Sequence, residues 1–358
     1  MSGNDDIKAQ AGRLLEFFSS NGARVIDTDI LQSAHTLLEL YGEDIRARAF
    51  VTHDPVAGEQ MLRPDFTVPV VQAHMKEGAE PARYTYCGKV FRRQERATAL
   101  PSEYLQVGYE VFDGSAPPEA DAEVFALIGQ ALGACAPRAV TGDMGVLLSA
   151  IRGLDTSAAR KAALLRHVWR PVRFRALLDR YSGKAPVPPA RAALLSESDP
   201  MKRARPLIGL RTAREISERI ESLRRDARKP PISAAETRLL DQILSLRAPM
   251  PAALSALEKM ASDMPQLEQS VVRFAARMAA LEERGVAIGD LMFEGSYGRT
   301  SMEYYDGFVF GFYAPDMPDD PIATGGRYDA LTRILGSGRS IPAVGGVIRP
   351  GLLVEART

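Results

Sequence analysis

The sequence contains few of the residues that build disulfide frameworks or metal centres. Among its 358 residues are two cysteines, Cys87 and Cys135, and four histidines. Two cysteines cannot form a disulfide framework, and the histidines show neither an HExxH motif nor an i, i+4 pair. We therefore expect no metal site and no bound cofactor. At Cys87, which lies in a strand-like run, we expect a buried and inert thiol.

Long apolar runs and an excess of one charge are also missing. No run reaches the roughly 18 apolar residues of a membrane-spanning helix, and the start, MSGNDDIKAQ, lacks the apolar core of a signal peptide. Lysine plus arginine and aspartate plus glutamate number 45 each, so the formal net charge is zero. These features argue against a membrane partner and a uniformly basic nucleic-acid binder, and they predict a cytoplasmic protein.

Standard motifs for catalysis and nucleotide binding are absent as well. The chain has no GxxxxGK[ST] loop and no GxSxG nucleophile elbow. The segment Gly336-Ser337-Gly338 lacks the third glycine of a dinucleotide-binding loop, and it follows a helical pattern instead of a strand. No residue is therefore assigned a catalytic role.

Charge and periodicity divide the chain into two kinds of sequence. Residues 151–230 carry 20 lysines and arginines against 8 aspartates and glutamates, a net charge of +12, and they read as helices broken by proline-rich linkers. The flanks hold short alternating runs typical of strands, at 47–53, 60–63, 83–92, 103–112, 291–293, 301–305, 308–313 and 322–326. We predict an α+β core, with a mostly antiparallel sheet, made of residues 1–150 and 285–358 and interrupted by a basic helical insertion at 151–284.

The run Glu103–Phe112, EYLQVGYEVF, carries the most chemical information. Its side chains alternate between two faces, so Gln106, Gly108 and Glu110 share one face. Because glycine has no side chain, a small molecule could lie against Gly108 between the amide and the carboxylate. The alternative is a solvated face, and this run by itself does not decide between the two.

Two further segments leave similar alternatives open. In YYDGFVFGFY, Gly307 and Gly311 leave room above the sheet, or Asp306-Gly307 marks a bend or bulge. In LRPDFT, either Asp65 or Thr67 is the N-cap of a helix that follows, or Asp65 presents its carboxylate to a cationic ligand.

Together these segments predict a pocket on an antiparallel sheet. It would be lined by two acids, one amide and two phenols, namely Asp65, Glu110, Gln106, Tyr304 and Tyr305. A carboxylate on the floor of a sheet is costly to bury without a cationic partner. The set therefore suits a ligand with an ammonium group and a second polar ring, and a zwitterionic amino acid fits that description.

Six motifs resemble the catalytic domain of histidyl-tRNA synthetase, in the same order. They are LRPDFT, YCGKVFRRQE, EYLQVGYEVF, EYYDGFVFGFYAP, GGRYDALTRILG and IPAVGG. The resemblance implies a class II aminoacyl-tRNA synthetase fold, with a six-stranded antiparallel sheet flanked by helices. It also implies a histidine pocket, with Asp65 and Thr67 at the amino group, Gln106, Glu110, Tyr304 and Tyr305 at the amino acid and imidazole, and Gly325 and Gly326 in a glycine-rich strand.

The chain departs from that family where the family activates its amino acid with ATP. By position, expected arginines are replaced by Thr300, Ser102 and Leu352, and a proline of the first class II motif is replaced by Asp29. Each cation lost from a site of developing charge costs about 10²–10³ in rate. We therefore expect no useful adenylate formation.

Three arginines remain close to these positions. Arg92 is kept as a residual anion contact. Arg299 is offset by one residue and would point to the other face of a strand. Arg349 comes three residues early, and we expect Pro350 after it to disrupt the helix that should follow.

A histidine pocket without the ATP machinery resembles the family of ATP phosphoribosyltransferase regulatory subunits. That resemblance implies a non-catalytic subunit that senses free histidine and supports a short-form catalytic subunit in the first step of histidine biosynthesis. It also implies a homodimeric core. The chain ends soon after IPAVGG, so we expect no anticodon-binding domain.

Two alternatives stay open. One is a truncated histidyl-tRNA synthetase, and the other is a synthetase paralogue that binds tRNA through the basic segment. We favour solvated helix faces as the explanation of that segment, so tRNA is not an expected partner. Docking of the segment onto an acidic partner subunit is also left open.

Overall fold

The structure is a computed structural model and describes residues 3–41, 45–93, 101–135, 138–203, 209–299 and 304–357. The strands of the described residues are β1 (Arg24–Val25), β2 (Leu31–Ser33), β3 (Val51–Asp54), β4 (Gly58–Leu62), β5 (Ala82–Phe91), β6 (Glu103–Phe112), β7 (Arg138–Asp143), β8 (Arg247–Pro249), β9 (Met292–Glu294), β10 (Phe308–Tyr313), β11 (Ala323–Arg327) and β12 (Ala343–Ile348).

The helices of the same residues are α1 (Asn4–Ser20), α2 (Ala34–Tyr41), α3 (Ile45–Arg48), α4 (Thr67–Glu77), α5 (Pro117–Leu132), α6 (Met144–Gly153), α7 (Ala158–Arg166), α8 (Pro171–Tyr181), α9 (Pro189–Ser196), α10 (Ala213–Ala227), α11 (Ala234–Ser245), α12 (Met250–Asp263), α13 (Glu268–Glu283), α14 (Asp329–Leu335) and α15 (Pro350–Glu355). No helix of the described residues is long and apolar enough to cross a membrane.

One large sheet organises the molecule. Its nine strands run in the order β1-β5-β6-β12-β11-β10-β7-β9-β8, and β2, β4 and β3 form a small second sheet. The six central strands, from β5 to β7, pair antiparallel throughout, whereas β1 with β5 and β7 with β9 pair parallel. This arrangement confirms the predicted α+β, class II synthetase-like sheet flanked by helices.

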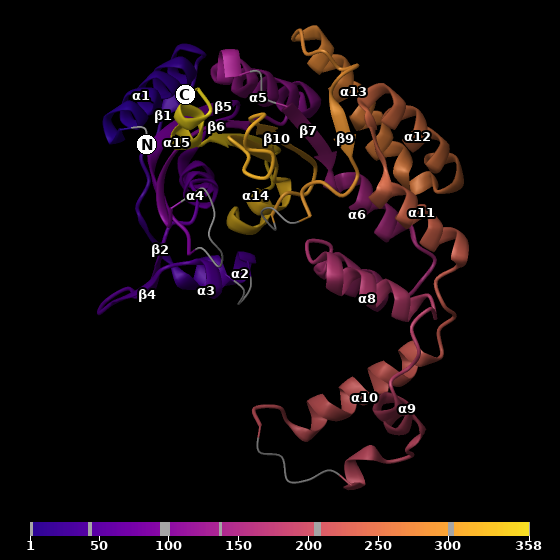
Figure 1. Cartoon of the computed structure of the whole chain (residues 1–358). Coiled ribbons are helices and arrows are strands. Elements are labelled where there is room, and N and C mark those ends of the chain that lie inside the picture. Colours follow the sequence, from indigo (N-terminus) through magenta and orange to yellow (C-terminus); the bar gives the residue numbers. More distant parts are fainter. Residues whose placement is uncertain are drawn as a thin grey trace.

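Helices cover the two faces of the sheet differently (Figure 1). Helices α1, α5, α13 and α15 lie over one face, where Phe18 of α1 stacks on Tyr109 of β6 with 5.3 Å between ring centroids. On the other face, His74 of α4 stacks on Phe112 at 4.0 Å. Because side chains alternate along β6, Gln106 and Glu110 lie on this second face with Phe112.

Two predicted features of the N-terminal half were wrong. The run 47–53 is not one strand, because its start belongs to the end of α3, where Ala49 N–H donates to the Ile45 carbonyl at 2.8 Å, and β3 starts only at Val51. Cys87 is exposed and not buried, because it shares its face of β5 with the exposed Lys89.

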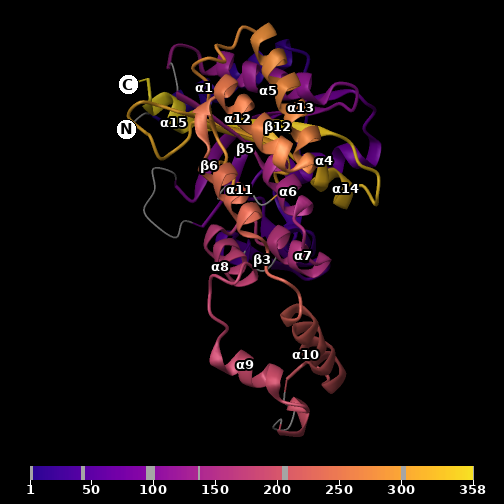
Figure 2. The ribbon, with the colours of Figure 1, turned by 90° about the vertical axis from the view of Figure 1, so that its right-hand side faces the viewer.

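The predicted insertion, 151–284, contains two kinds of structure. Its later part packs with the core, since β8 pairs with β9 and Arg277 of α13 bonds Asp121 of α5. We call residues 182–231 the basic arm, and its described residues, with α9 and α10, project away from the sheet in both Figure 1 and Figure 2. The arm leaves and returns at one place, where Ile232 N–H donates to the carbonyl of Tyr181 at 2.9 Å.

Candidate functional site

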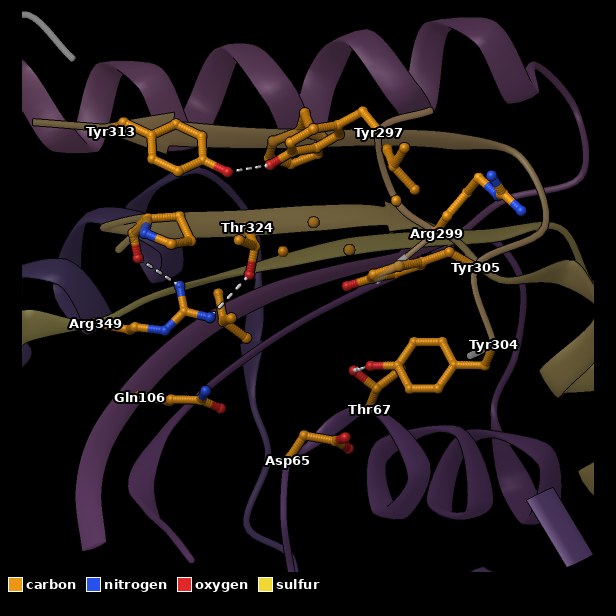
Figure 3. A pocket seen from close by; sticks show the side chains of 18 of the residues that line it. Asp65, Thr67, Gln106, Tyr297, Arg299, Tyr304, Tyr305, Tyr313, Thr324 and Arg349 are labelled. Atoms are coloured by element: carbon orange, nitrogen blue, oxygen red, sulfur yellow. Dashed lines mark hydrogen bonds between the residues drawn. The ribbon is translucent and has the colours of Figure 1, made fainter. Parts of the chain in front are cut away.

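A cavity of about 690 Å³ opens on the face of the sheet that carries Gln106 and Glu110. Figure 3 shows its side chains, which come from β6, β11, the loop before α4 and the segments before β10 and α15. Most of the predicted ligand residues line it together, namely Asp65, Thr67, Gln106, Glu110, Tyr304, Tyr305 and Gly325, with Arg92. Gly326 does not, because the Tyr305 ring and the Phe308 carbonyl lie where its Cβ would be.

Glu110 lies at the floor of the cavity and is only 1% exposed. Its carboxylate accepts hydrogen bonds from the hydroxyls of Tyr328 at 2.5 Å and Tyr86 at 2.8 Å. Burial raises the pKa of Glu110 to about 7, the hydrogen bonds oppose that rise, and nearby Asp65 adds to it. The side chain can therefore exist as acid or carboxylate near neutral pH, and as carboxylate it can accept a ring N–H.

Gly108 makes room for a side chain of the protein itself and not for a ligand. It lies opposite Tyr86 across the β5–β6 pair, and a Cβ at Gly108 would come within 2.1 Å of the Tyr86 ring. The prediction that a small molecule lies against Gly108 was therefore wrong. Gly345 serves Glu110 in the same way, because a Cβ there would lie 1.5 Å from Glu110 Oε2.

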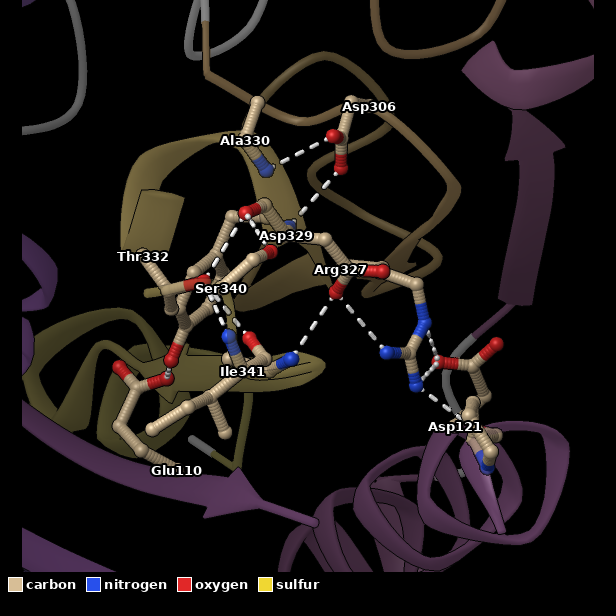
Figure 4. A network of polar contacts seen from close by, with 12 residues as sticks. Glu110, Asp121, Asp306, Arg327, Asp329, Ala330, Thr332, Ser340 and Ile341 are labelled. Atoms are coloured by element: carbon tan, nitrogen blue, oxygen red, sulfur yellow. Dashed lines mark hydrogen bonds and ion pairs between the residues drawn. The ribbon is translucent and has the colours of Figure 1, made fainter. Parts of the chain in front are cut away.

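The two glycines near β10 have comparable roles. A Cβ at Gly311 would meet the Tyr297 hydroxyl at 2.0 Å, so the predicted room above the sheet is filled. Gly307 sits in a bend before β10, which is the alternative that the sequence left open. The carboxylate of Asp306 next to it accepts two backbone N–H groups at the start of α14, at 3.0 and 2.8 Å (Figure 4).

Neither Asp65 nor Thr67 caps a helix. The N-cap of α4 is Phe66, without a side-chain hydrogen bond, and Thr67 is the first residue of the helix. Thr67 Oγ1 instead accepts a hydrogen bond from the Tyr304 hydroxyl at 3.2 Å and lies 3.5 Å from Glu110 Oε1. Asp65 is 3% exposed and faces the same cavity. The geometry therefore favours a role for both side chains at the cavity.

Gln106 is a buried amide whose hydrogen-bonding capacity is unused by the described part of the chain. It is fully buried, and neither its Oε1 nor its Nε2 has a hydrogen-bond partner there. Buried polar groups are nearly always paired, so an unused amide in a cavity wall indicates a ligand or ordered water. Gln106 can donate to and accept from such a ligand at once.

Arg349 is a cavity residue that sequence reasoning set aside. Pro350 does not disrupt the following helix, because it occupies the first turn of α15, where a missing N–H costs nothing. The preceding Arg349 is 7% exposed and donates to the Pro321 carbonyl at 2.8 Å and to Thr324 Oγ1 at 3.1 Å. Among the described residues, its Nε has no hydrogen-bond partner and no carboxylate pairs with it.

Arg299 also lines the cavity, at the side away from Arg349 in Figure 3. Its Nε donates to the Val168 carbonyl at 2.8 Å, and its guanidinium lies 4.8 Å from the ring centroid of Phe174. Burial lowers the pKa of Arg299 to about 10, and nearby Arg175 lowers it further. This arginine is therefore tied to the segment that enters the insertion.

The positions expected to carry synthetase arginines differ in what the structure says of them. Thr300 lies outside the described residues. Ser102 accepts a backbone hydrogen bond from Arg92 N–H at 2.8 Å, and Leu352 is buried in the core at 2% exposure. Asp29 is exposed. Arg92 itself holds the Pro64 carbonyl through Nε at 2.7 Å, next to Asp65.

The cavity thus combines negative and positive walls. Glu110 Oε1 lies 3.5 Å from Thr67 Oγ1, and Figure 3 shows Asp65 beside Thr67 and Arg349 at the opposite side of the cavity, near Gln106. A buried charge is stable only when it is paired or solvated, so Arg349, with which no described carboxylate pairs, calls for an anionic group, and the carboxylates can accept a cationic one. One molecule with an ammonium group and a carboxylate would satisfy both.

Comparisons with known proteins agree with this fold. The histidyl-tRNA synthetase family model matches residues 4–227 and 216–350. The solved structure of an ATP phosphoribosyltransferase regulatory subunit/histidyl-tRNA synthetase from Bacillus halodurans C superposes with a TM-score of 0.69 at 22% identity, over 99% of this chain and 79% of that one. A histidyl-tRNA synthetase from Nostoc sp. PCC 7120 gives 0.63 at 16% identity, over 98% of this chain and 70% of the other. The fold and family match define a histidyl-tRNA synthetase-like protein of class II.

Sequence relatives narrow this class. The ATP phosphoribosyltransferase regulatory subunit of Brucella anthropi is 32% identical over 345 residues, and that of Brucella canis is 31% identical over 344. Each alignment covers 90% of this chain and 90% of the relative. The chain belongs to the family of ATP phosphoribosyltransferase regulatory subunits.

Proposed function

We propose that this chain is a non-catalytic regulatory subunit of an ATP phosphoribosyltransferase and that it binds free histidine in the cavity described above. It would work in the cytoplasm, in the first step of histidine biosynthesis, with a short-form catalytic subunit as its partner and a homodimeric core of its own. The family supports the regulatory role. The observation that carries histidine binding is the cavity, with buried carboxylates at one side and, at the other, a buried arginine with which no carboxylate of the described residues pairs.

Each end of a histidine zwitterion has a chemical counterpart in the cavity. The ammonium group would face Asp65 and Thr67, because a carboxylate and a hydroxyl both accept its N–H bonds. The imidazole would lie toward Glu110 and Tyr305. The carboxylate would face Gln106 and Arg349, since a guanidinium and an amide N–H are its natural donors.

This orientation assigns Arg349 a role that differs from ATP binding. Its terminal nitrogens already donate to Pro321 and Thr324, which fixes the plane of the guanidinium against β11. A fixed guanidinium loses little further entropy when it binds a carboxylate. With Leu352 in the core and Ser102 in place of an arginine, the proposal includes no adenylate chemistry.

Histidine can regulate only if it binds two states of the assembly with different affinities. Couplings of this kind are typically about 1–3 kcal/mol, or roughly 5–150-fold in affinity. The proposal therefore requires that the catalytic subunit alter the histidine affinity of this chain by the same factor by which histidine alters the affinity between the subunits.

Reconstitution tests the proposal. The full chain is mixed with the catalytic ATP phosphoribosyltransferase subunit encoded by the same genome, and both co-elution and phosphoribosyl transfer to ATP are measured. We expect a complex, transfer that depends on the chain, and inhibition by histidine that a Gln106→Ala chain weakens. Separate elution of the two proteins would overturn the proposal.

A second assay addresses the truncated-synthetase alternative. Histidine-dependent exchange of pyrophosphate into ATP is measured with the chain alone, and an authentic histidyl-tRNA synthetase serves as positive control. The proposal expects no exchange above the blank. A robust exchange rate would overturn the proposal and show that the chain is an enzyme.

A further inference from the structure

A second cavity of about 550 Å³ lies elsewhere on the molecule and shares no lining residue with the first. It is enclosed by α6, α13, α14, the start of α5 and the connection from α7 to α8. None of the six motifs assigns it a ligand, and the proposed histidine site does not use it.

Two arginines and three acids form ion pairs at the floor of this cavity. Arg277 pairs with Asp143 at 2.6 Å and with Asp121 at 3.2 Å, and Arg327 pairs with Asp121 at 2.7 Å and Asp329 at 3.0 Å. Figure 4 shows Arg327 between these last two acids. These ion pairs hold the floor together, and their three carboxylates exceed the two guanidinium groups by one negative charge. Attraction for an anion must therefore come from other residues.

The rim carries three further arginines from three helices. Arg152 of α6, Arg273 of α13 and Arg333 of α14 are all exposed and line the same cavity. None of them forms an ion pair with an acid in the described ranges, and Arg273 donates only to Ser270 Oγ, at 3.3 Å. Asp306 is the remaining acid, and it is engaged by two backbone N–H groups of α14. The mouth of the cavity is therefore positively charged.

Two buried donors inside the cavity are also unused. The indole Nε1–H of Trp169 is buried without a hydrogen-bond acceptor among the described atoms. The Nε–H of Arg277 is also buried without an acceptor among the described atoms, and this side chain is 3% exposed. Unused buried donors are rare in folded proteins. Donors inside and guanidinium groups outside are complementary to a ligand that brings several acceptor oxygens and negative charge.

We infer that this cavity binds a small anion that carries a phosphate or diphosphate group. Arginine binds such groups through paired N–H bonds, and several arginines around one cavity favour a multivalent anion over chloride or acetate. The site joins the core helices to the connection that leads to the basic arm, so a bound anion would hold these elements together. This inference does not depend on histidine binding.

The test uses tryptophan fluorescence, because Trp169 is the only tryptophan of the chain. Inorganic diphosphate is titrated into the full chain at constant ionic strength, and calorimetry is run in parallel. We expect saturable binding by both methods. Arg333→Gln and Arg152→Gln should each weaken it by about tenfold or more, since a charge-assisted hydrogen bond is worth about that factor.

Arg214→Gln is the matched control, because Arg214 is an exposed arginine of α10 far from the cavity in sequence. It should leave the diphosphate affinity unchanged, and all variants should keep the wild-type unfolding midpoint. No saturable binding at millimolar diphosphate would overturn the inference. So would equal affinities in wild type and both rim variants, or binding of an acidic peptide but not of diphosphate.

Discussion

At the scale of single residues, the sheet uses glycine to seat large polar side chains. Gly108 admits the ring of Tyr86, and Gly345 admits the carboxylate of Glu110. The result is a floor of buried phenols around one acid, in which hydrogen bonds fix Glu110 from both of its oxygens. Packing of this kind tolerates little added volume.

Gly108→Ala is expected to destabilise the protein. The new Cβ would lie 2.1 Å from the Tyr86 ring, so Tyr86 must move and its bond to Glu110 is strained. Overpacking of this kind lowers the free energy of unfolding by about 1–3 kcal/mol, which urea denaturation measures. Gly12→Ala in α1 is the control: it meets nothing within 4 Å and should stabilise its helix. An equally stable Gly108→Ala protein would contradict the packing described.

Glu110→Gln is expected to change the pH dependence of stability. The folded protein holds the proton of Glu110 up to about pH 7, whereas the unfolded chain releases it near the ordinary value of 4.5. Ionising this buried acid therefore costs folding free energy as the pH rises between these values, by at most about 3 kcal/mol.

The glutamine variant lacks this cost. Its stability relative to wild type should rise between pH 5 and pH 8, as measured by urea denaturation at each pH. A stability difference that stays constant over this range would show that Glu110 titrates as an ordinary carboxyl.

Arg349→Gln is expected to remove discrimination for a ligand carboxylate. If Arg349 holds that group, histidine should bind the variant about tenfold or more weakly, because a charge-assisted hydrogen bond is lost. Histamine has no carboxylate and should bind wild type and variant alike. The variant leaves no described acid unpaired and should remain folded, although it loses the hydrogen bonds to Pro321 and Thr324. Calorimetric titration with both ligands measures the affinities. An equal loss of affinity for histidine and for histamine would count against the role assigned to Arg349.

At the scale of elements, the sequence predicted strands better than it predicted what fills the space between them. The limits of β6 and β10 match the predicted runs, because alternation and β-branched or aromatic residues extend over their whole length. Ser301–Tyr305 was expected as a strand. Residues 301–303 lie outside the described residues, and Tyr304 lies in a turn.

Other sequence-based predictions were wrong or incomplete because they depend on residues that are distant in the sequence. The start of α15 at Pro350 depends on where the preceding strand ends, because proline is suited to the first helical turn but not to the interior. The exposure of Cys87 depends on which helices cover β5. The partners of Glu110 depend on strand register, which places Tyr86 opposite Gly108.

An ion-pair cluster joins the basic arm to α7, and it can be tested. Asp226 of α10 accepts from Arg160 Nε at 2.6 Å and Arg191 at 3.2 Å, and so links three helices. Asp226→Asn should accelerate tryptic cleavage within 182–231 several-fold, because breaking a partly buried pair leaves Arg160 without its acid. Fragment mass spectrometry gives the sites and rates.

The control for the arm is Glu218→Gln. It breaks the exposed Arg214–Glu218 pair on the same helix, which is worth little. Histidine affinity should be unchanged in both variants. Equal cleavage rates in Asp226→Asn and wild type would show that the arm is anchored in some other way.

At the scale of the whole molecule, the net charge is zero, but positive and negative charges are unevenly distributed along the chain. The basic arm carries 12 lysines and arginines against 6 acids, and the core balances it. A cavity on the sheet has charged walls of both signs, and α6, α13 and α14 line a second cavity with a positive mouth. A subunit built in this way can offer separate surfaces to a small ligand and to a partner.

Much of the first cavity could be predicted from sequence, because many of its lining residues lie in motifs that keep their spacing. Asp65, Thr67 and Gln106 are examples. The place of Arg349 in the cavity could not be predicted, because the expected arginine position was counted along a helix and did not take into account where β12 ends. Tyr328 could not either, because its bond to Glu110 spans 218 residues of sequence.

The central claim is that the cavity of this chain binds free histidine, and calorimetric titration of histidine into the wild-type chain and into Glu110→Gln tests it most directly. The account predicts saturable binding to the wild type with one site per chain, and an affinity at least tenfold lower in the variant. Absence of binding, or equal affinities in the two proteins, would contradict it.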